Sequence, residues 1–142
     1  MNINEKFRSE LTETDHIKDY VLGGHGIVTL VSDTTNVHHT YSFHKPEGRD
    51  DIMFINTLVD GSNWVYVGYY RNGEFRLTAK SAYKPDSAIV KGVAYIFKVI
   101  LGGTAVDSMH ILHEGVCCRC GRPLTNPASI RLGIGPTCMS KL

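Results

Sequence analysis

The most useful absences in this 142-residue chain concern membranes and secretion. No apolar run approaches the ~18 residues that span a bilayer, which excludes a helical membrane protein. Residues 1–5 lack the basic-then-apolar profile of a secretory signal peptide, so we expect a cytoplasmic protein whose cysteines stay reduced. The chain also has no internal repeat and no low-complexity tract, which excludes solenoid and disordered classes.

Net charge is small as well, only +1, but the two parts of the chain differ in sign. Residues 1–61 carry five Lys or Arg against ten Asp or Glu, and residues 62–142 carry ten against four. Such a separation is compatible with a nucleic-acid-binding face on the C-terminal part, or with a match of opposite charges between the two parts.

What is present is the composition of a globular protein, with 42% hydrophobic and 20% charged residues. A chain of this size buries roughly 68–70% of the surface that its unfolded form exposes, which is enough for an ordinary core. We therefore expect one domain, with room for a small appendage.

β-branched and aromatic residues, interrupted by turn sequences, predict five strands in the middle of the chain. The clearest turn is Asn72-Gly73, because both positions of a type I′ hairpin turn require positive φ. The expected strands are residues 27–31, 38–43, 52–59, 63–71 and 74–80.

Pairing across the Asn72-Gly73 turn sorts the side chains of its hairpin into two faces. It places Arg71 opposite Glu74, Tyr70 opposite Phe75 and Tyr69 opposite Arg76. The face assigned to the core holds Trp64, Tyr66, Tyr70, Phe75, Leu77 and Ala79. The outer face holds Val65, Val67, Tyr69, Arg71, Arg76, Thr78 and Lys80.

Apolar residues at helical spacing predict three helices. The main core helix is expected over residues 87–101, before Gly102-Gly103. Shorter helices are expected from an N-cap at Asp15 to Gly23-Gly24 and over residues 3–11. Together these elements predict an α+β domain at residues 1–105, an antiparallel meander packed by one long helix, and a zinc-binding module at residues 106–142.

Three cysteines with the spacing of a metal site define that module. Cys117 and Cys120 are separated by two residues, and Cys138 lies eighteen residues after Cys120. Two thiolates in this spacing can hold one ion from a tight turn, and tetrahedral zinc requires two further ligands. We expect Cys138 and His113 to supply them, which would fill the coordination shell and make the single Zn²⁺ structural.

Two of these positions have alternatives. His110 could replace His113, although His113 leaves less backbone to fold back. Cys118 could replace Cys117, but with Cys120 it would form the less common Cys-x-Cys spacing. The rival interpretations are buried reduced cysteines and a redox Cys-x-x-Cys motif, which would leave Cys138 without a role.

The stretch His-Glu-Gly-x-Cys-x-x-Cys-Gly-Arg-x-Leu-Thr-x-Pro-x-Ser-Ile, followed by Gly-Ile-Gly-Pro-x-Cys, resembles the C-terminal signature of a family of bacteriophage and mobile-element proteins of unknown function. The likeness extends upstream to residue 15, through motifs such as Val21-Leu22-Gly23-Gly24. It implies metal ligands at His113, Cys117, Cys120 and Cys138, with Cys118 at a position that is usually small. It also implies a phage-encoded accessory protein in the bacterial host cytoplasm, without an established activity.

Nucleic-acid binding is the first functional hypothesis, because cations beside aromatic side chains suit backbone tracking and base stacking. The simpler interpretation is a solvated sheet face and basic residues that cover the negative charge of the zinc site. The second hypothesis is a module that docks on a host protein and inhibits it. The residues expected to bind nucleic acid or a partner are Tyr69, Arg71, Arg76, Lys80, Arg119, Arg122 and Arg131.

We do not expect an enzyme. Adjacent residues of a strand point to opposite faces, so His38 and His39 cannot join one site. His39 shares its face with Tyr41 and Phe43, as a core residue would. The glycine-rich residues 23–26 lack the Lys-Ser/Thr of a phosphate loop.

Overall fold

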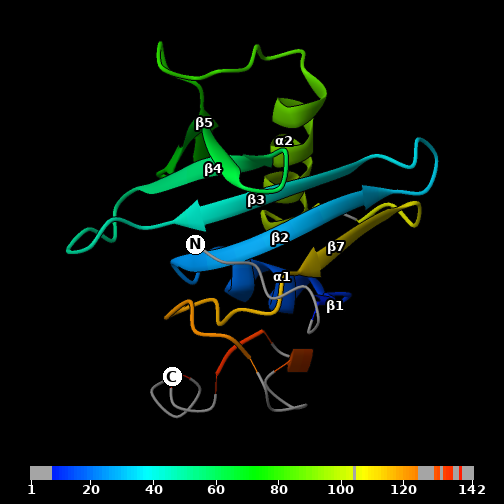
Figure 1. Ribbon diagram of the computed structural model, residues 1–142, viewed down its shortest axis with the longest axis vertical. Coiled ribbons are helices and arrows are strands. Elements are labelled where there is room, and N and C mark those ends of the chain that lie inside the picture. Colours follow the sequence, from blue (N-terminus) through cyan, green and yellow to red (C-terminus); the bar gives the residue numbers. More distant parts are fainter. Residues whose placement is uncertain (1–7, 104, 125–129, 132, 136–137, 139–142) are drawn as a thin grey trace.

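The computed structural model describes residues 8–103, 105–124, 130–131, 133–135 and 138. These residues form an α+β fold, a seven-stranded antiparallel sheet with two helices (Figure 1). The strands are β1 (Ser9–Glu10), β2 (His25–Ser32), β3 (His38–His44), β4 (Met53–Val59), β5 (Asn63–Arg71), β6 (Glu74–Arg76) and β7 (Met109–His113), and the helices are α1 (Thr14–Val21) and α2 (Ala88–Ile100).

The predicted five-stranded meander is confirmed as β2 to β6, within the order β1-β7-β2-β3-β4-β5-β6. Two further strands extend it beyond β2, since β7 pairs with β2 and β1 pairs with β7. Strand β7 lies inside the segment predicted as the zinc module, so the sheet continues past the expected boundary at residue 105. The predicted helix over residues 3–11 is wrong where the structure describes it, because Ser9 and Glu10 are a strand; residues 1–7 lie outside the described part.

The hairpin at Asn72-Gly73 has the predicted register, with Tyr70 opposite Phe75 and Tyr69 opposite Arg76. Both turn residues have positive φ, 53° and 78°, as a type I′ turn requires. Strand β6 ends at Arg76 instead of residue 80, because the chain then turns on itself: the Thr78 N–H donates to Ser81 Oγ at 2.8 Å.

The predicted core face of β5 is wrong over its first half. The β4–β5 register shifts between Ile55 and Asn56, where a β-bulge inserts one extra residue, Val67. A bulge reverses the alternation of side chains, so Val67 is fully buried while Tyr66 lies on the outer face. There the Tyr66 ring contacts that of Phe54, at 6.2 Å between centroids.

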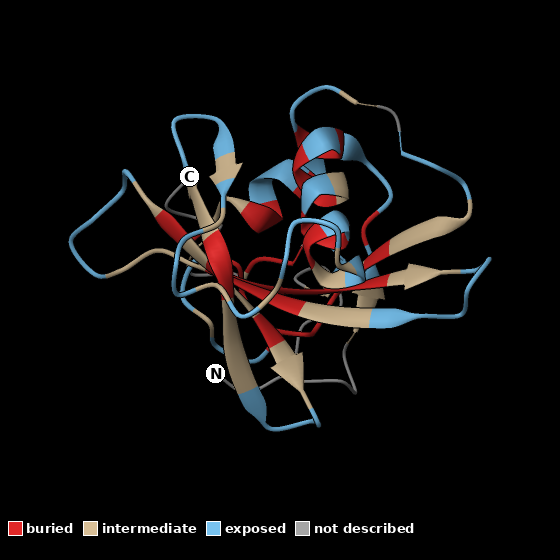
Figure 2. Cartoon of the chain, turned by 90° about the horizontal axis from the view of Figure 1, so that it is seen from above, coloured by how far each residue is buried: buried red, intermediate tan, exposed pale blue. Residues whose placement is uncertain are grey.

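Helix α2 lies across the inner face of the sheet and turns its buried side toward it (Figure 2). The Phe97 ring stacks on Tyr70 at 4.3 Å and meets the edge of Phe43 at 5.7 Å between centroids. The N-cap is Ser87, whose side chain accepts a hydrogen bond from the Val90 N–H. These contacts confirm the predicted core helix.

Helix α1 is confirmed too, but it begins earlier than predicted: its N-cap is Glu13 and not Asp15. Ile17, Tyr20 and Val21 bury its inner side in the same core as α2. Within the described ranges, neither helix combines the length and the apolarity needed to cross a bilayer.

Candidate metal centre

The structure brings three of the four cysteines together. The Sγ atoms of Cys117, Cys120 and Cys138 all lie within 4.8 Å of one another. Tetrahedral zinc with Zn–S bonds of about 2.3 Å would place its sulfurs ~3.8 Å apart, so a small closure of this group fits one ion. Soft thiolates are also the ligands that zinc and similar ions prefer.

The backbone of residues 115–124, here called the knuckle, shapes two of these positions. The Cys117 N–H donates to the Arg122 carbonyl at 2.8 Å, and the Gly121 N–H donates to the Cys117 carbonyl at 2.9 Å. A bridge between Val116 and Pro123 closes the hairpin behind them. The knuckle therefore presents the sulfurs of Cys117 and Cys120 from one rigid turn.

Backbone donors also prepare Cys117 for a cation. Burial alone would raise the pKa of the Cys117 thiol, but N–H groups from Gly135, Cys120 and Arg119 outweigh it and hold that pKa below its ordinary value. The Gly135 N–H lies 3.2 Å from the Cys117 sulfur. In contrast, burial and the neighbouring sulfurs raise the pKa of Cys138 to about 11. A bound cation is what would allow all three to ionise together near neutral pH.

His113, predicted as the fourth ligand, does not join the three sulfurs in the structure. Its Nδ1 accepts a hydrogen bond from the Gly115 N–H at 3.0 Å, and its Nε2 contacts the Ile130 carbonyl. The ring is fully buried and stacks on Tyr20, at 5.4 Å between centroids. Its burial lowers the pKa of His113, against the opposing effects of Ile130 and Glu114, so the ring is neutral at pH 7.

The two alternative ligands also lie outside the group of sulfurs. His110 bridges two carboxylates, with Nδ1 3.1 Å from Glu10 and Nε2 2.8 Å from Asp33. Cys118 is buried against Gly23, where a Cβ would stand 2.9 Å from its sulfur. Every histidine and cysteine of the chain is described, and only Cys117, Cys120 and Cys138 come together as a possible metal site among those residues.

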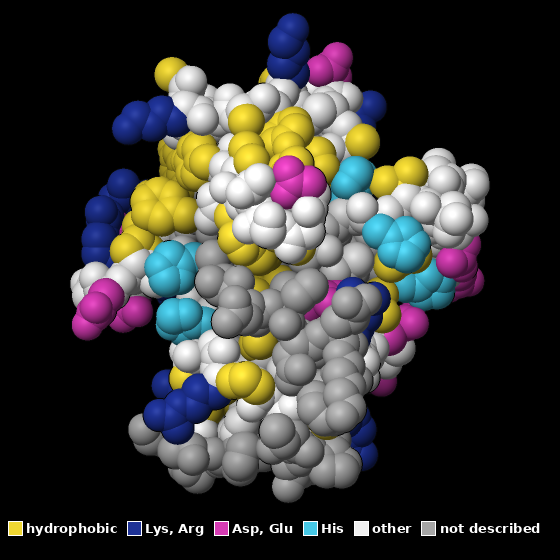
Figure 3. All heavy atoms as spheres, in the orientation of Figure 1, with side chains coloured by type: hydrophobic (Ala, Val, Ile, Leu, Met, Phe, Trp, Pro, Cys, Tyr) yellow, Lys and Arg dark blue, Asp and Glu magenta, His cyan; other side chains and the backbone are white. Residues whose placement is uncertain are grey.

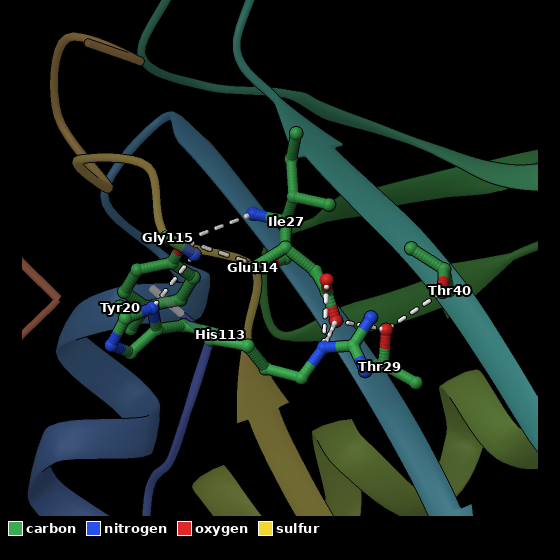
Figure 4. A network of polar contacts seen from close by, with 8 residues as sticks. Tyr20, Ile27, Thr29, Thr40, His113, Glu114 and Gly115 are labelled. Carbon is green, nitrogen blue, oxygen red and sulfur yellow. Dashed lines mark hydrogen bonds and ion pairs between the residues drawn. The ribbon is translucent and has the colours of Figure 1, made fainter. Parts of the chain in front are cut away.

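His113 and Glu114 instead fix the knuckle to the sheet (Figure 4). As successive residues they point to opposite faces of the sheet, His113 toward Tyr20 and Glu114 toward Thr29. Glu114 is fully buried, and its carboxylate accepts hydrogen bonds from Thr29 Oγ1 and, at 2.9 Å, from Arg8 Nε. Thr29 in turn contacts Thr40 at 2.7 Å between hydroxyl oxygens. Glu114 is the single acidic residue of residues 108–142, here called the metal segment, and its charge is therefore neutralised inside the protein.

Tyr20 holds the other side of the junction. Its hydroxyl donates to the Val116 carbonyl at 2.9 Å and lies 3.3 Å from the Ile27 N–H. Gly133 lies against the same ring, and a Cβ there would stand 2.4 Å from a Tyr20 carbon. Its φ of 74° is a second reason for glycine at this position.

The arginines predicted to bind nucleic acid fall into two groups. On the sheet, Arg71 Nη2 lies 3.5 Å from Asp51, and Arg76 forms an ion pair with Glu74. Glu74 therefore compensates Arg76, whereas Asp51 lies closer to Arg49, at 2.7 Å, and is shared between two arginines. Tyr69 lies opposite Arg76 in the register, and Lys80 is exposed in the turn after β6.

In the metal segment, Arg119, Arg122 and Arg131 are exposed, and none of them pairs with a carboxylate of the described residues. Arg119 Nη1 donates to the Cys138 carbonyl at 3.3 Å, which places its charge beside the sulfurs. Arg119 therefore places an uncompensated positive charge beside the sulfurs, whereas Lys80, which also pairs with no carboxylate of the described residues, lies in the turn after β6.

Three residues that hold the site in place were missed from the sequence. Arg8 and Tyr20 lie about a hundred positions before their partners Glu114 and Val116, and nothing local signals such pairing. The glutamate of His-Glu-Gly was a usable signal, because an acid beside an apolar strand is seldom buried without a cation.

Comparison with known proteins gives one family match, in the C-terminal part of the chain. Residues 108–142 match a family of unknown function, DUF6011. The match begins at residue 108, so it bears out the resemblance only over the C-terminal signature. No curated protein and no solved structure matches the chain.

Proposed function

We propose that this chain is a phage-type accessory protein that holds one structural Zn²⁺ at Cys117, Cys120 and Cys138 and binds nucleic acid through the arginines beside it. The observation that carries the proposal is the position of two arginines without a carboxylate partner in the described part: Arg119 donates to the Cys138 carbonyl, and the Arg122 carbonyl accepts from the Cys117 N–H. Two arginines and one Zn²⁺ against three thiolates leave a local charge of about +1. Such a surface attracts phosphate groups by counterion release.

The zinc would tie Cys138 to the knuckle, and thereby hold the C-terminal segment in a fixed position. Because His113 is held outside the group of sulfurs, the fourth ligand would be a non-protein one such as water. The role we propose is not enzymatic. His39 contacts Tyr41 on the inner face while His38 starts and His44 ends β3, so these histidines share no site.

A salt titration of binding to a short oligothymidylate tests the proposal. Each arginine that contacts a phosphate contributes a slope of about 0.7 in the logarithm of the affinity against the logarithm of salt concentration. The double variant Arg119→Gln, Arg122→Gln should therefore lower the slope by about 1.4. Arg76→Gln is the matched control, because Arg76 is also exposed but is already paired with Glu74.

Binding that is the same in both variants, or that does not change with salt, would contradict the proposal. Tight capture of a host protein with little salt dependence would favour the alternative, a docking module with a mainly apolar interface.

A further inference from the structure

The outer face of the sheet, away from α1 and α2, is covered by no helix of the described residues (Figure 1). Cross-strand neighbours on β2 to β5 form a continuous row there, here called the aromatic row: His25, His44, Phe54 and Tyr69. The rings of His25 and His44 meet edge to face at 5.4 Å between centroids. Rings thus follow one another from strand to strand across this face.

A hollow of about 680 Å³ opens beside the aromatic row, between β3–β5 and the turn after β6. Phe54 and Tyr66 line it with their rings, Asn56 contributes an amide, and Lys80 is the one Lys, Arg, Asp or Glu among the described residues that line it. The turn forms a fixed wall, because the Ala82 N–H donates to the Tyr66 carbonyl at 3.2 Å. On the face drawn in Figure 3, hydrophobic and histidine side chains lie next to one another.

We infer that this hollow is a base-stacking site for unpaired nucleotides of a single-stranded nucleic acid. The inference rests on the proposed function and adds the class of ligand. Phe, Tyr and His rings stack on bases, an amide such as that of Asn56 can pair with a base edge, and Lys80 can meet a phosphate. A duplex keeps its bases inside the helix, so it could not place them on these rings.

Charge and continuity favour a nucleic acid over a peptide. Among the described residues, the lining contains a cation and no acid, which suits a polyanion. The aromatic row also ends at the knuckle: a Cβ on Gly121 would lie 3.7 Å from that of His25. Arg122, exposed and without a carboxylate partner in the described part, follows Gly121 directly. One strand could therefore contact the arginines and the hollow together.

The test compares an oligothymidylate of about ten nucleotides with an abasic oligomer of the same length and with a duplex. Phe54→Leu and Tyr66→Leu should each weaken oligothymidylate binding about five- to 160-fold, the effect of one lost base stack. Both should leave binding of the abasic oligomer unchanged, because the arginines remain. Emission of Trp64, the single tryptophan, should fall when bases stack on the wild-type sheet.

Each outcome separates the two proposals. If folded Phe54→Leu and Tyr66→Leu bind like the wild type, or the abasic oligomer binds equally well, the stacking site is refuted while the arginine surface stands. If only these variants weaken binding and Arg119→Gln, Arg122→Gln does not, the stacking site stands and the knuckle surface is refuted. If no oligomer binds, both are refuted. If a ring variant fails to fold, Lys80→Gln, in an exposed turn, replaces it in the test. Unchanged affinity of Lys80→Gln for the oligothymidylate would count against the stacking site.

Discussion

Replacing His113 by leucine tests whether this residue is a metal ligand or an anchor, that is, a residue that only fixes the knuckle to the sheet. Leucine fills much of the same volume but can neither hydrogen-bond nor stack. The variant loses the contacts of Nδ1 with Gly115 and of Nε2 with Ile130, each worth about 0.5–1.5 kcal/mol. It also loses the stacking on Tyr20, worth about 0.5–1.5 kcal/mol.

These terms predict a loss of about 1.5–4.5 kcal/mol in the free energy of unfolding. For a chain of this size, that lowers Tm by roughly 5–15 °C, measured by circular dichroism at saturating metal. Because His113 lies outside the group of sulfurs, the folded variant should still bind one metal per chain. The visible spectrum of its cobalt form should match that of the wild type, since the same three thiolates would bind the ion.

Cys138→Ser is the matched comparison, because it removes one of the three sulfurs and leaves the anchor intact. It should lose most of the metal affinity while the sheet stays folded. A folded His113→Leu protein that holds no metal, or whose cobalt bands shift, would refute the geometric reasoning and restore His113 as the fourth ligand.

Three further predictions concern a glycine, a histidine and the pH dependence of metal binding. Gly133→Ala and Gly48→Ala each place a methyl group at nearly the same backbone φ, 74° and 78°, but only at Gly133 does the methyl group meet a ring, that of Tyr20. We expect backbone strain alone to destabilise Gly48→Ala by about 1 kcal/mol, and strain plus the clash to destabilise Gly133→Ala by roughly 3–4 kcal/mol, measured by urea unfolding. Contacts with Asp33 and then Glu10 raise the pKa of His110 above 6.5, so the protonated ring stabilises the fold fully below pH 6.5 and loses this effect as pH rises through the folded pKa. NMR titration should show the raised pKa of His110, and the stability of His110→Gln should equal that of the wild type at high pH only. Metal affinity should fall as pH falls below neutrality, because the thiols must lose protons to bind, and an affinity independent of pH between about 6 and 8 would contradict thiolate ligation.

Local signals in the sequence predicted the meander well, because each turn is specified by its own residues. Asn72 and Gly73 have the positive φ that their type suggests, and the register of the hairpin follows from them. The β-bulge at Val67 has no such signal. It depends on Gly68, where a Cβ would stand 2.5 Å from the Arg76 carbonyl, a contact between strands that spacing along the chain does not reveal.

The candidate site shows the same division between local and distant causes. The spacing of Cys117 and Cys120 is a property of one turn, and the sequence suffices to place their sulfurs side by side. The ring of His113 contacts Tyr20, from α1, and Ile130, from the segment that follows the knuckle in the sequence. The spacing of four residues between His113 and Cys117 would allow both to bind one ion if the segment folded alone. In the folded chain, the contacts with Tyr20 and Ile130 hold His113 outside the group of sulfurs.

The metal segment and the sheet share one hydrophobic core, which changes what the metal would stabilise. Cys117, Cys118, Leu124 and Ile134 belong to the same buried cluster as the residues of α1 and β2. The His25 N–H donates to the Cys118 carbonyl at 2.8 Å, so the first residue of β2 is hydrogen-bonded to the knuckle itself. An ion bound at the three sulfurs would therefore stabilise the end of the sheet where the aromatic row begins, and the arginines and the outer face would keep a fixed spacing for one extended ligand.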